Sequence, residues 1–165
     1  MNPVPRWAIA TTWTLSLLGL ALTVILTIAH FDGAKLLPYC PSNIHGGGTF
    51  DCALVTTSPQ SYFLHIPVAV LGLIQYTALA VIMSPWAWRS RFRLLHLVRF
   101  AMTAIGMAMV IWLVWAEAVI IGHFCEYCSG VHIVTVALFL IMTRVAPEQL
   151  GWTRRHEDAA SVVVS

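Results

Sequence analysis

The sequence predicts an all-α integral membrane protein, a bundle of four transmembrane helices with a short interfacial helix in the first external loop. Hydrophobic residues make up 59% of the 165 residues and charged residues only 10%. Soluble domains are typically about 45–50% apolar and ~25% charged. One small core cannot bury this much apolar surface, so lipid must surround most of the chain. The apolar runs are continuous and close to the roughly 20 residues that a spanning helix needs, which excludes a membrane β-barrel.

The predicted membrane helices cover residues 7–29, 63–83, 98–121 and 125–145, within a single membrane domain over residues 1–165. The first run is too long for the apolar part of a signal peptide and lacks a convincing cleavage site, so we expect a retained helix. Residues 30–62 form the external loop, and residues 146–165 form a polar cytoplasmic tail. A short helix in the loop should end before Ser58-Pro59, because the residue before a proline disfavours the α conformation.

The basic residues predict the orientation of the chain in the membrane. Of its 9 lysine and arginine residues, all except Lys35 fall on one side of the predicted helices. Cytoplasmic loops carry an excess of Lys and Arg, so both termini should be cytoplasmic. We therefore expect an inner (cytoplasmic) membrane protein whose loops 30–62 and 122–127 face the periplasm or its equivalent. The net charge of +2 reflects this topology, and no basic patch suggests nucleic-acid binding.

All four cysteines of the chain fall at this external face, where an oxidising compartment favours disulfide chemistry. Cys125 and Cys128 form a C-E-Y-C motif at the start of the last predicted helix, where the helix dipole favours a thiolate. Cys40 and Cys52 lie further apart in the first loop, on either side of a glycine run. Two such pairs in series can relay electrons from an aqueous dithiol to a lipid-soluble acceptor. A quinone is the common membrane oxidant that takes two electrons and two protons.

Two other interpretations of the cysteines stay open at this point. They could form structural disulfides in a non-catalytic membrane protein. They could also bind zinc, which favours C-x₂-C spacing, with help from His45, His65 or His123. The wide spacing of the first pair argues against the metal site, and we assign no residue to a metal.

The chain resembles the vitamin K epoxide reductase family, in its bacterial quinone-linked form, over roughly residues 7–145. The resemblance rests on the loop cysteine pair, on Ser58 after its second member, on the stretch H-I-P-V-A-V-L-G-L-I-Q-Y over residues 65–76, and on C-E-Y-C. Another family of periplasmic thiol oxidants also has four helices and two cysteine pairs, but there the C-x-x-C motif comes first. The order of the pairs therefore favours the vitamin K epoxide reductase type.

The resemblance implies a role for each cysteine and a separate protein partner. Cys128 would react with the quinone, either menaquinone or ubiquinone, and Cys125 would resolve it and exchange with Cys52. Cys40 would exchange with a thioredoxin-like, disulfide-introducing partner, because no such domain is fused to this chain. The activity implied is a quinone-dependent thiol oxidoreductase that supports disulfide formation in exported proteins.

Five further residues are expected to contact the quinone. The resemblance implies that Ser58 fixes the short loop helix over the quinone pocket. His132 lies one turn after Cys128, where it could donate a hydrogen bond to a quinone carbonyl or bond a neighbouring helix, and both interpretations stay open. Thr56, Val68 and Ile121 complete the set. His65 stands where bacterial members of the family often have glycine.

Overall fold

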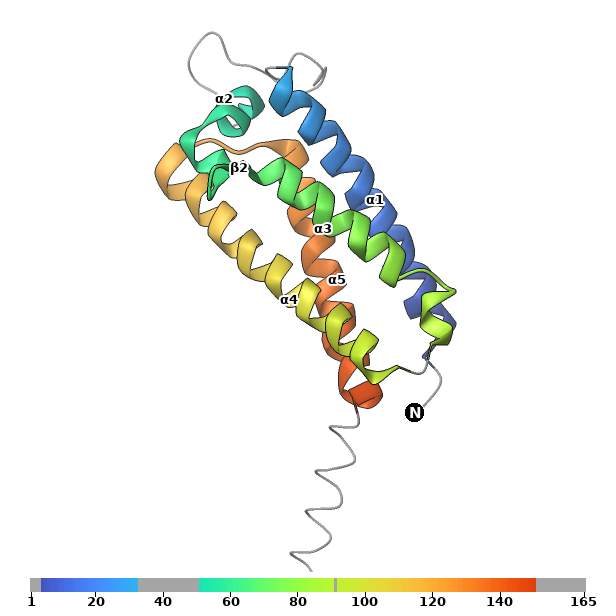
Figure 1. The fold of residues 1–165 in the computed structure, drawn as a ribbon. Helices are drawn as coiled ribbons and strands as arrows, with labels where there is room; N and C mark the ends of the chain where they lie inside the picture. The colour runs from blue at the N-terminus through green and yellow to red at the C-terminus, as the bar shows by residue number, and fades with distance from the viewer. Residues whose placement is uncertain (1–3, 33–50, 91, 151–165) are drawn as a thin grey trace, which may run out of the picture.

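The computed structural model describes residues 4–32, 51–90 and 92–150 as a bundle of four helices (Figure 1). The bundle consists of α1 (Arg6–Phe31), α3 (Val68–Ile82), α4 (Arg93–Trp115) and α5 (Glu126–Leu150). A six-residue π-helical segment, Ala116–Ile121, continues α4. The predicted all-α membrane bundle is confirmed, with one very small sheet in addition.

The helices differ in whether they are long enough to cross a membrane alone. Within the described residues, Arg6–Phe31, Arg93–Ile121 and Glu126–Pro147 are sufficiently long and apolar. Helix α3 has 15 residues, so at 1.5 Å per residue it is shorter than the ~30 Å hydrocarbon core. The predicted helix over residues 63–83 was therefore too long at its N-terminal end. A hairpin of β1 (Tyr62–Phe63) and β2 (Ile66–Pro67) takes the place of its first turn.

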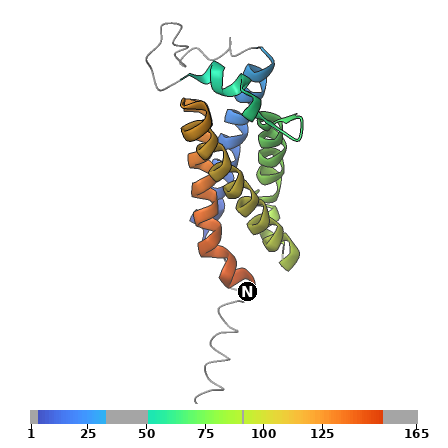
Figure 2. The same ribbon diagram turned by 90° about the vertical axis from the view of Figure 1, so that its left-hand side faces the viewer.

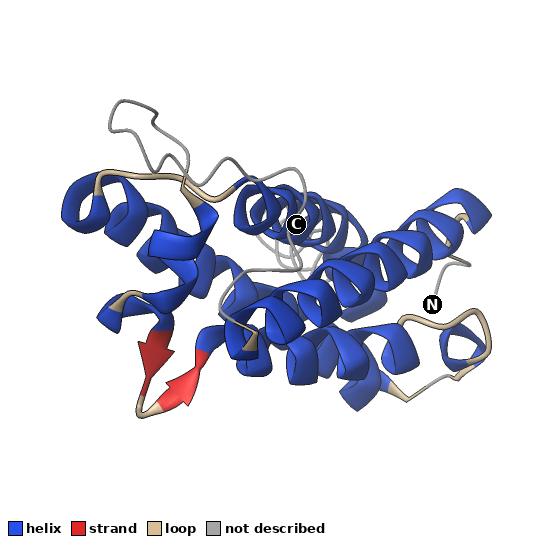
Figure 3. Cartoon of the chain, turned by 90° about the horizontal axis from the view of Figure 1, so that it is seen from above, coloured by secondary structure: helices blue, strands red, loops and turns tan. Residues whose placement is uncertain are grey.

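The short helix predicted in the first loop is present as α2 (Cys52–Thr57). The carboxylate of Asp51 caps its start by accepting a hydrogen bond from the backbone N–H of Leu54 at 2.9 Å. The helix ends at Ser58, which has an extended backbone before Pro59, as the sequence predicts. Helix α2 lies across one end of the bundle (Figure 2), and the hairpin projects from the same end (Figure 3).

A close approach between α1 and α3 anchors the middle of the bundle. A methyl group on Gly19 would overlap the ring of Tyr76, so only glycine fits there. The Tyr76 hydroxyl in turn reaches α5, where it lies 2.8 Å from the Thr135 hydroxyl and 3.3 Å from the carbonyl oxygen of Val131. One buried tyrosine thus ties three helices together at the height of the cavity described below.

The opposite end of the bundle gathers the start of α1, the start of α4 and the end of α5 (Figure 1). Arg99 lies there with its side chain fully buried. Its Nε donates a hydrogen bond to the carbonyl oxygen of Ile82 at 2.7 Å, at the C-terminus of α3. Its guanidinium also lies 4.1 Å from the centre of the Trp88 ring. A cation at a helix C-terminus complements the helix dipole, so Arg99 stabilises the end of α3 from inside the bundle.

Candidate functional site

A cavity of about 510 Å³ lies in the half of the bundle that carries the cysteines. Helices α1, α3, α4 and α5 form its walls. Residues 55–66, which comprise the end of α2, the following turn and the hairpin, close it at one end. Most of the lining is aliphatic or aromatic, with a few polar groups. Cavities of this size and character bind small, mainly apolar molecules.

All five residues predicted to contact a quinone line this cavity. They come from four elements that the fold brings together, namely α2 with its C-cap, α3, the π-helical segment and α5: Thr56, Ser58, Val68, Ile121 and His132. Cys128 lines the same cavity, whereas Cys52 and Cys125 do not. The structure therefore places one of the described cysteines against the space where an apolar ligand would lie.

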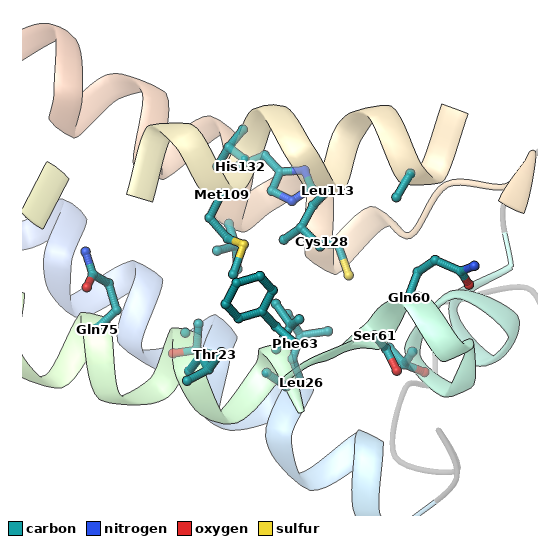
Figure 4. A pocket seen from close by; sticks show the side chains of 18 of the residues that line it. Thr23, Leu26, Gln60, Ser61, Phe63, Gln75, Met109, Leu113, Cys128 and His132 are labelled. Atoms are coloured by element: carbon teal, nitrogen blue, oxygen red, sulfur yellow. The ribbon is translucent and has the colours of Figure 1, made fainter. Parts of the chain in front are cut away.

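Cys128 and His132 project into the cavity from successive turns of α5 (Figure 4). Residues four apart on a helix share a face, so the side of α5 that carries one necessarily carries the other. His132 is nearly buried, with 8% of its surface exposed. Met109 and Leu113 of α4 lie beside it (Figure 4). The imidazole of His132 is a polar group one helical turn from Cys128 in a mainly apolar part of the cavity.

Cys52 and Cys125 lie together in a buried cluster that borders the cavity. Both are buried, at 1% and 0% exposed, in one cluster with Leu26, Ala29 and Val55. The preceding residues are joined directly, because the backbone N–H of Asp51 donates a hydrogen bond to the carbonyl oxygen of Phe124 at 3.1 Å. Cys125 of the C-x-x-C motif thus lies next to Cys52 of the loop pair.

The position of Cys125 immediately before α5 determines its electrostatics. The backbone N–H of Cys128 points at the Cys125 sulfur from 3.4 Å, as at a helix N-cap. A hydrogen bond from the Cys128 side chain lowers the pKa of Cys125 below its ordinary value, and backbone N–H groups add to this effect. These donors outweigh burial and the nearby Glu117, which both act to raise this pKa. Cys125 is therefore the thiol that the fold favours as a thiolate.

The oxidation states of the cysteines differ. Cys52 is disulfide-bonded, and Cys125 and Cys128 are free thiols. Cys40, to which the resemblance assigns exchange with a partner protein, lies outside the described residues. Within the described ranges, no three His, Cys, Asp or Glu side chains come together as a metal site.

The segment that covers the cavity is held by polar contacts that the sequence did not reveal. His30, in the last turn of α1, has its Nδ1 2.8 Å from the carbonyl oxygen of Thr56 and its Nε2 3.1 Å from the Tyr62 hydroxyl. The Ser58 hydroxyl donates to the carbonyl oxygen of Val55 at 2.9 Å. His30 thus fastens both α2 and the hairpin to α1. A polar residue at the end of an apolar run is an ordinary feature of sequences, so only the fold shows its role.

Comparison with known families agrees with this arrangement. The model of the vitamin K epoxide reductase family matches residues 10–143, which include α3, α4, most of α1 and α5, and all four cysteines. The chain belongs to the vitamin K epoxide reductase family. No individually curated protein matches it.

Membership of the vitamin K epoxide reductase family gives the described site a chemical class. It makes the protein a membrane thiol-disulfide oxidoreductase, since members couple redox-active cysteines to quinones. The free thiol of Cys128 beside an apolar cavity, and the buried neighbours Cys52 and Cys125, are the described groups suited to that chemistry.

Proposed function

We propose that this protein relays electrons from a separate thioredoxin-like protein, through two cysteine pairs, to menaquinone or ubiquinone in the cytoplasmic membrane. Its net product is disulfide bonds in exported proteins, with the cysteines on the periplasmic side. The observation that carries the proposal is the division of the cysteines between two environments. Cys128 faces the apolar cavity, and Cys125 packs beside Cys52.

The relay runs through two exchanges and one redox step. A reduced partner donates two electrons to the loop disulfide, breaking the bond between Cys40 and Cys52 as a disulfide forms in the partner. The Cys52 thiolate then attacks Cys125 in the oxidised C-x-x-C pair, Cys40 completes the loop disulfide, and Cys125 and Cys128 are left as thiols. Finally these two thiols give two electrons and two protons to the quinone, which leaves as hydroquinone as the Cys125–Cys128 disulfide forms.

The residues around the cavity have distinct tasks in this proposal. His132 is the donor available to a quinone carbonyl near Cys128, because both lie on one face of α5. Thr56 and Ser58 belong to the segment that closes the cavity against water, and Val68 and Ile121 add apolar contact. Excluding water strengthens each polar interaction within such a site.

The decisive experiment measures quinone reduction by a dithiol with purified protein in detergent. Cys128→Ala should lose roughly 10²-fold or more of the turnover, because no other described cysteine lines the cavity. Ser129→Ala, on the next residue of the same helix, serves as the control. Undiminished turnover by Cys128→Ala would contradict the relay, and a stoichiometric zinc ion that blocks thiol alkylation would favour a metal site instead.

A further inference from the structure

Glu117 is a buried acid that has no role in the relay proposed above. Only 4% of its surface is exposed, and its Oε2 atom has no hydrogen-bond partner among the described residues. Burying a charged carboxylate without a partner is energetically costly. A group with this cost inside a membrane helix calls for a functional explanation.

The backbone around Glu117 departs from regular α-helix. Ala116–Ile121 is π-helical, and the backbone N–H of Gly122 donates to the carbonyl oxygen of Glu117 at 2.9 Å. The segment ends at Gly122 in the left-handed region, with φ of 73°, where glycine is favoured. π-Helical turns are frequent at functional sites because they redirect a side chain that a regular helix would place elsewhere.

This segment places Glu117 in the wall of the same cavity as Cys128 and His132. The carboxylate interacts electrostatically with both thiols of the C-x-x-C pair. The described lining contains no lysine or arginine that could pair with this carboxylate. Its basic groups are the imidazoles of His30 and His132.

We propose that Glu117 carries a proton from the Cys128 thiol to a quinone oxygen. The inference rests on the proposed function and adds a catalytic residue to it. The carboxylate takes the proton as the Cys128 sulfur becomes a thiolate, and then returns it to the quinone oxygen as the two electrons arrive. Cys125 gives up its proton to water on becoming a thiolate, and water returns one proton to the second quinone oxygen, so one disulfide and one hydroquinone form and Glu117 ends in its initial state.

The test compares Glu117→Gln with wild type in steady-state quinone reduction by a dithiol. Gln keeps the size of Glu but cannot carry the proton, so kcat should fall by about 10²-fold, the usual contribution of general acid–base catalysis. KM for the quinone and the melting temperature should stay close to those of wild type. The solvent deuterium isotope effect on kcat should rise, because proton transfer becomes slower than the other steps. Reduction of the oxidised Cys125–Cys128 pair by dithiol, measured without quinone, should be unchanged.

Two further variants make the outcome unambiguous. Glu117→Asp retains a carboxylate and should recover part of the lost kcat. Asp32→Asn removes an exposed carboxylate at the same end of the bundle and should leave kcat within about twofold, as distant surface changes do. Wild-type kcat in Glu117→Gln, or a loss that appears only as a raised KM and a lowered melting temperature, would overturn the inference. An inactive wild type would instead overturn the proposed function.

Discussion

At the scale of single residues, the two thiols of the C-x-x-C motif occupy different environments although they are only three positions apart. Cys125 receives hydrogen bonds at the start of α5, and Cys128 lies one turn further in, against the cavity. The first thiol is therefore suited to exchange with another sulfur, and the second to react with an apolar molecule. The division of tasks follows from helix geometry and requires no further element.

This difference predicts how the reactivity of Cys125 depends on pH. Because the Cys128 side chain lowers the pKa of Cys125, its thiolate should form at a lower pH than that of an ordinary cysteine. Removing the donor with Cys128→Ala should raise this pKa, so the Cys125 thiolate should then form at a higher pH. The ultraviolet thiolate absorbance of reduced protein across a pH series, taken as the difference from a matched protein that also carries Cys125→Ser, gives both midpoints.

The comparison has a conservative control. Cys128→Ser retains a hydroxyl donor and should keep the Cys125 midpoint below that of Cys128→Ala. Identical midpoints for all three proteins would show that the Cys128 side chain does not set the reactivity of Cys125.

The sequence predicted these cavity residues but did not predict other buried polar residues of the bundle. The spacing of Cys128 and His132 is enough to place them on one face of a helix. The burial of Arg99 could not be predicted, because it looks like one more member of a run of arginines at a membrane boundary. Its partners, the Ile82 carbonyl and the Trp88 ring, come from a turn whose path the sequence does not specify.

At the scale of elements, the hairpin before α3 is the feature that sequence patterning missed. Residues 63–66 are mostly apolar and extend the hydrophobic run of α3. The structure instead puts Leu64 and His65 at φ of 51° and 66°, in the left-handed region. Two such residues form the turns that suit a tight hairpin, where Asn and Gly are usual. His65, at a position where bacterial relatives often have glycine, was the one available signal for this turn.

The approach of α1 to α3 allows a direct test of packing. Gly19→Ala would force the Tyr76 ring aside and disturb its hydrogen bond to Thr135. Overpacking of this kind typically lowers the free energy of unfolding by about 1–3 kcal/mol. Thermal or denaturant unfolding in detergent measures the loss, and quinone affinity should fall as well, because Tyr76 lines the cavity.

Gly130 offers a matched control on α5. A methyl group there would lie 3.4 Å from the Cδ1 atom of Leu22, an ordinary van der Waals contact. Gly130→Ala should therefore keep the stability or raise it by up to about 1 kcal/mol through helix propensity. Equal effects of the two substitutions would contradict the close contact between Gly19 and Tyr76.

At the scale of the whole molecule, the two ends of the bundle differ in charge and chemistry. Arginines gather where α1 and α4 begin, and the described cysteines lie at the other end. In a variant whose four cysteines are replaced by serine, Asp32→Cys should react with a membrane-impermeant maleimide in intact cells. Ser90→Cys, near the arginine end, should react only after permeabilisation. The reverse pattern would show that the cytoplasmic side has been misassigned.

Much of this architecture could be predicted from the sequence, because a membrane limits the structures that a chain can adopt. The lengths of the apolar runs predicted the helix bundle, and the order of the cysteine pairs indicated the family that residues 10–143 match. The hydrogen bond between residues 51 and 124 could not be predicted from the sequence, because it joins backbone groups of two loops and does not depend on the type of side chain. That contact is what brings Cys52 and Cys125 into one cluster.

The burial of Cys52 and Cys125 also bears on how the protein behaves in a compartment full of small thiols. With 1% and 0% of their surfaces exposed, neither sulfur can meet glutathione or free cysteine by simple collision. In the proposed relay, electrons would then reach these two sulfurs through the loop disulfide of Cys52, and direct attack by a metabolite would contribute little. Such shielding would favour a protein client over small thiols as the consumer of the oxidising equivalents that the quinone supplies.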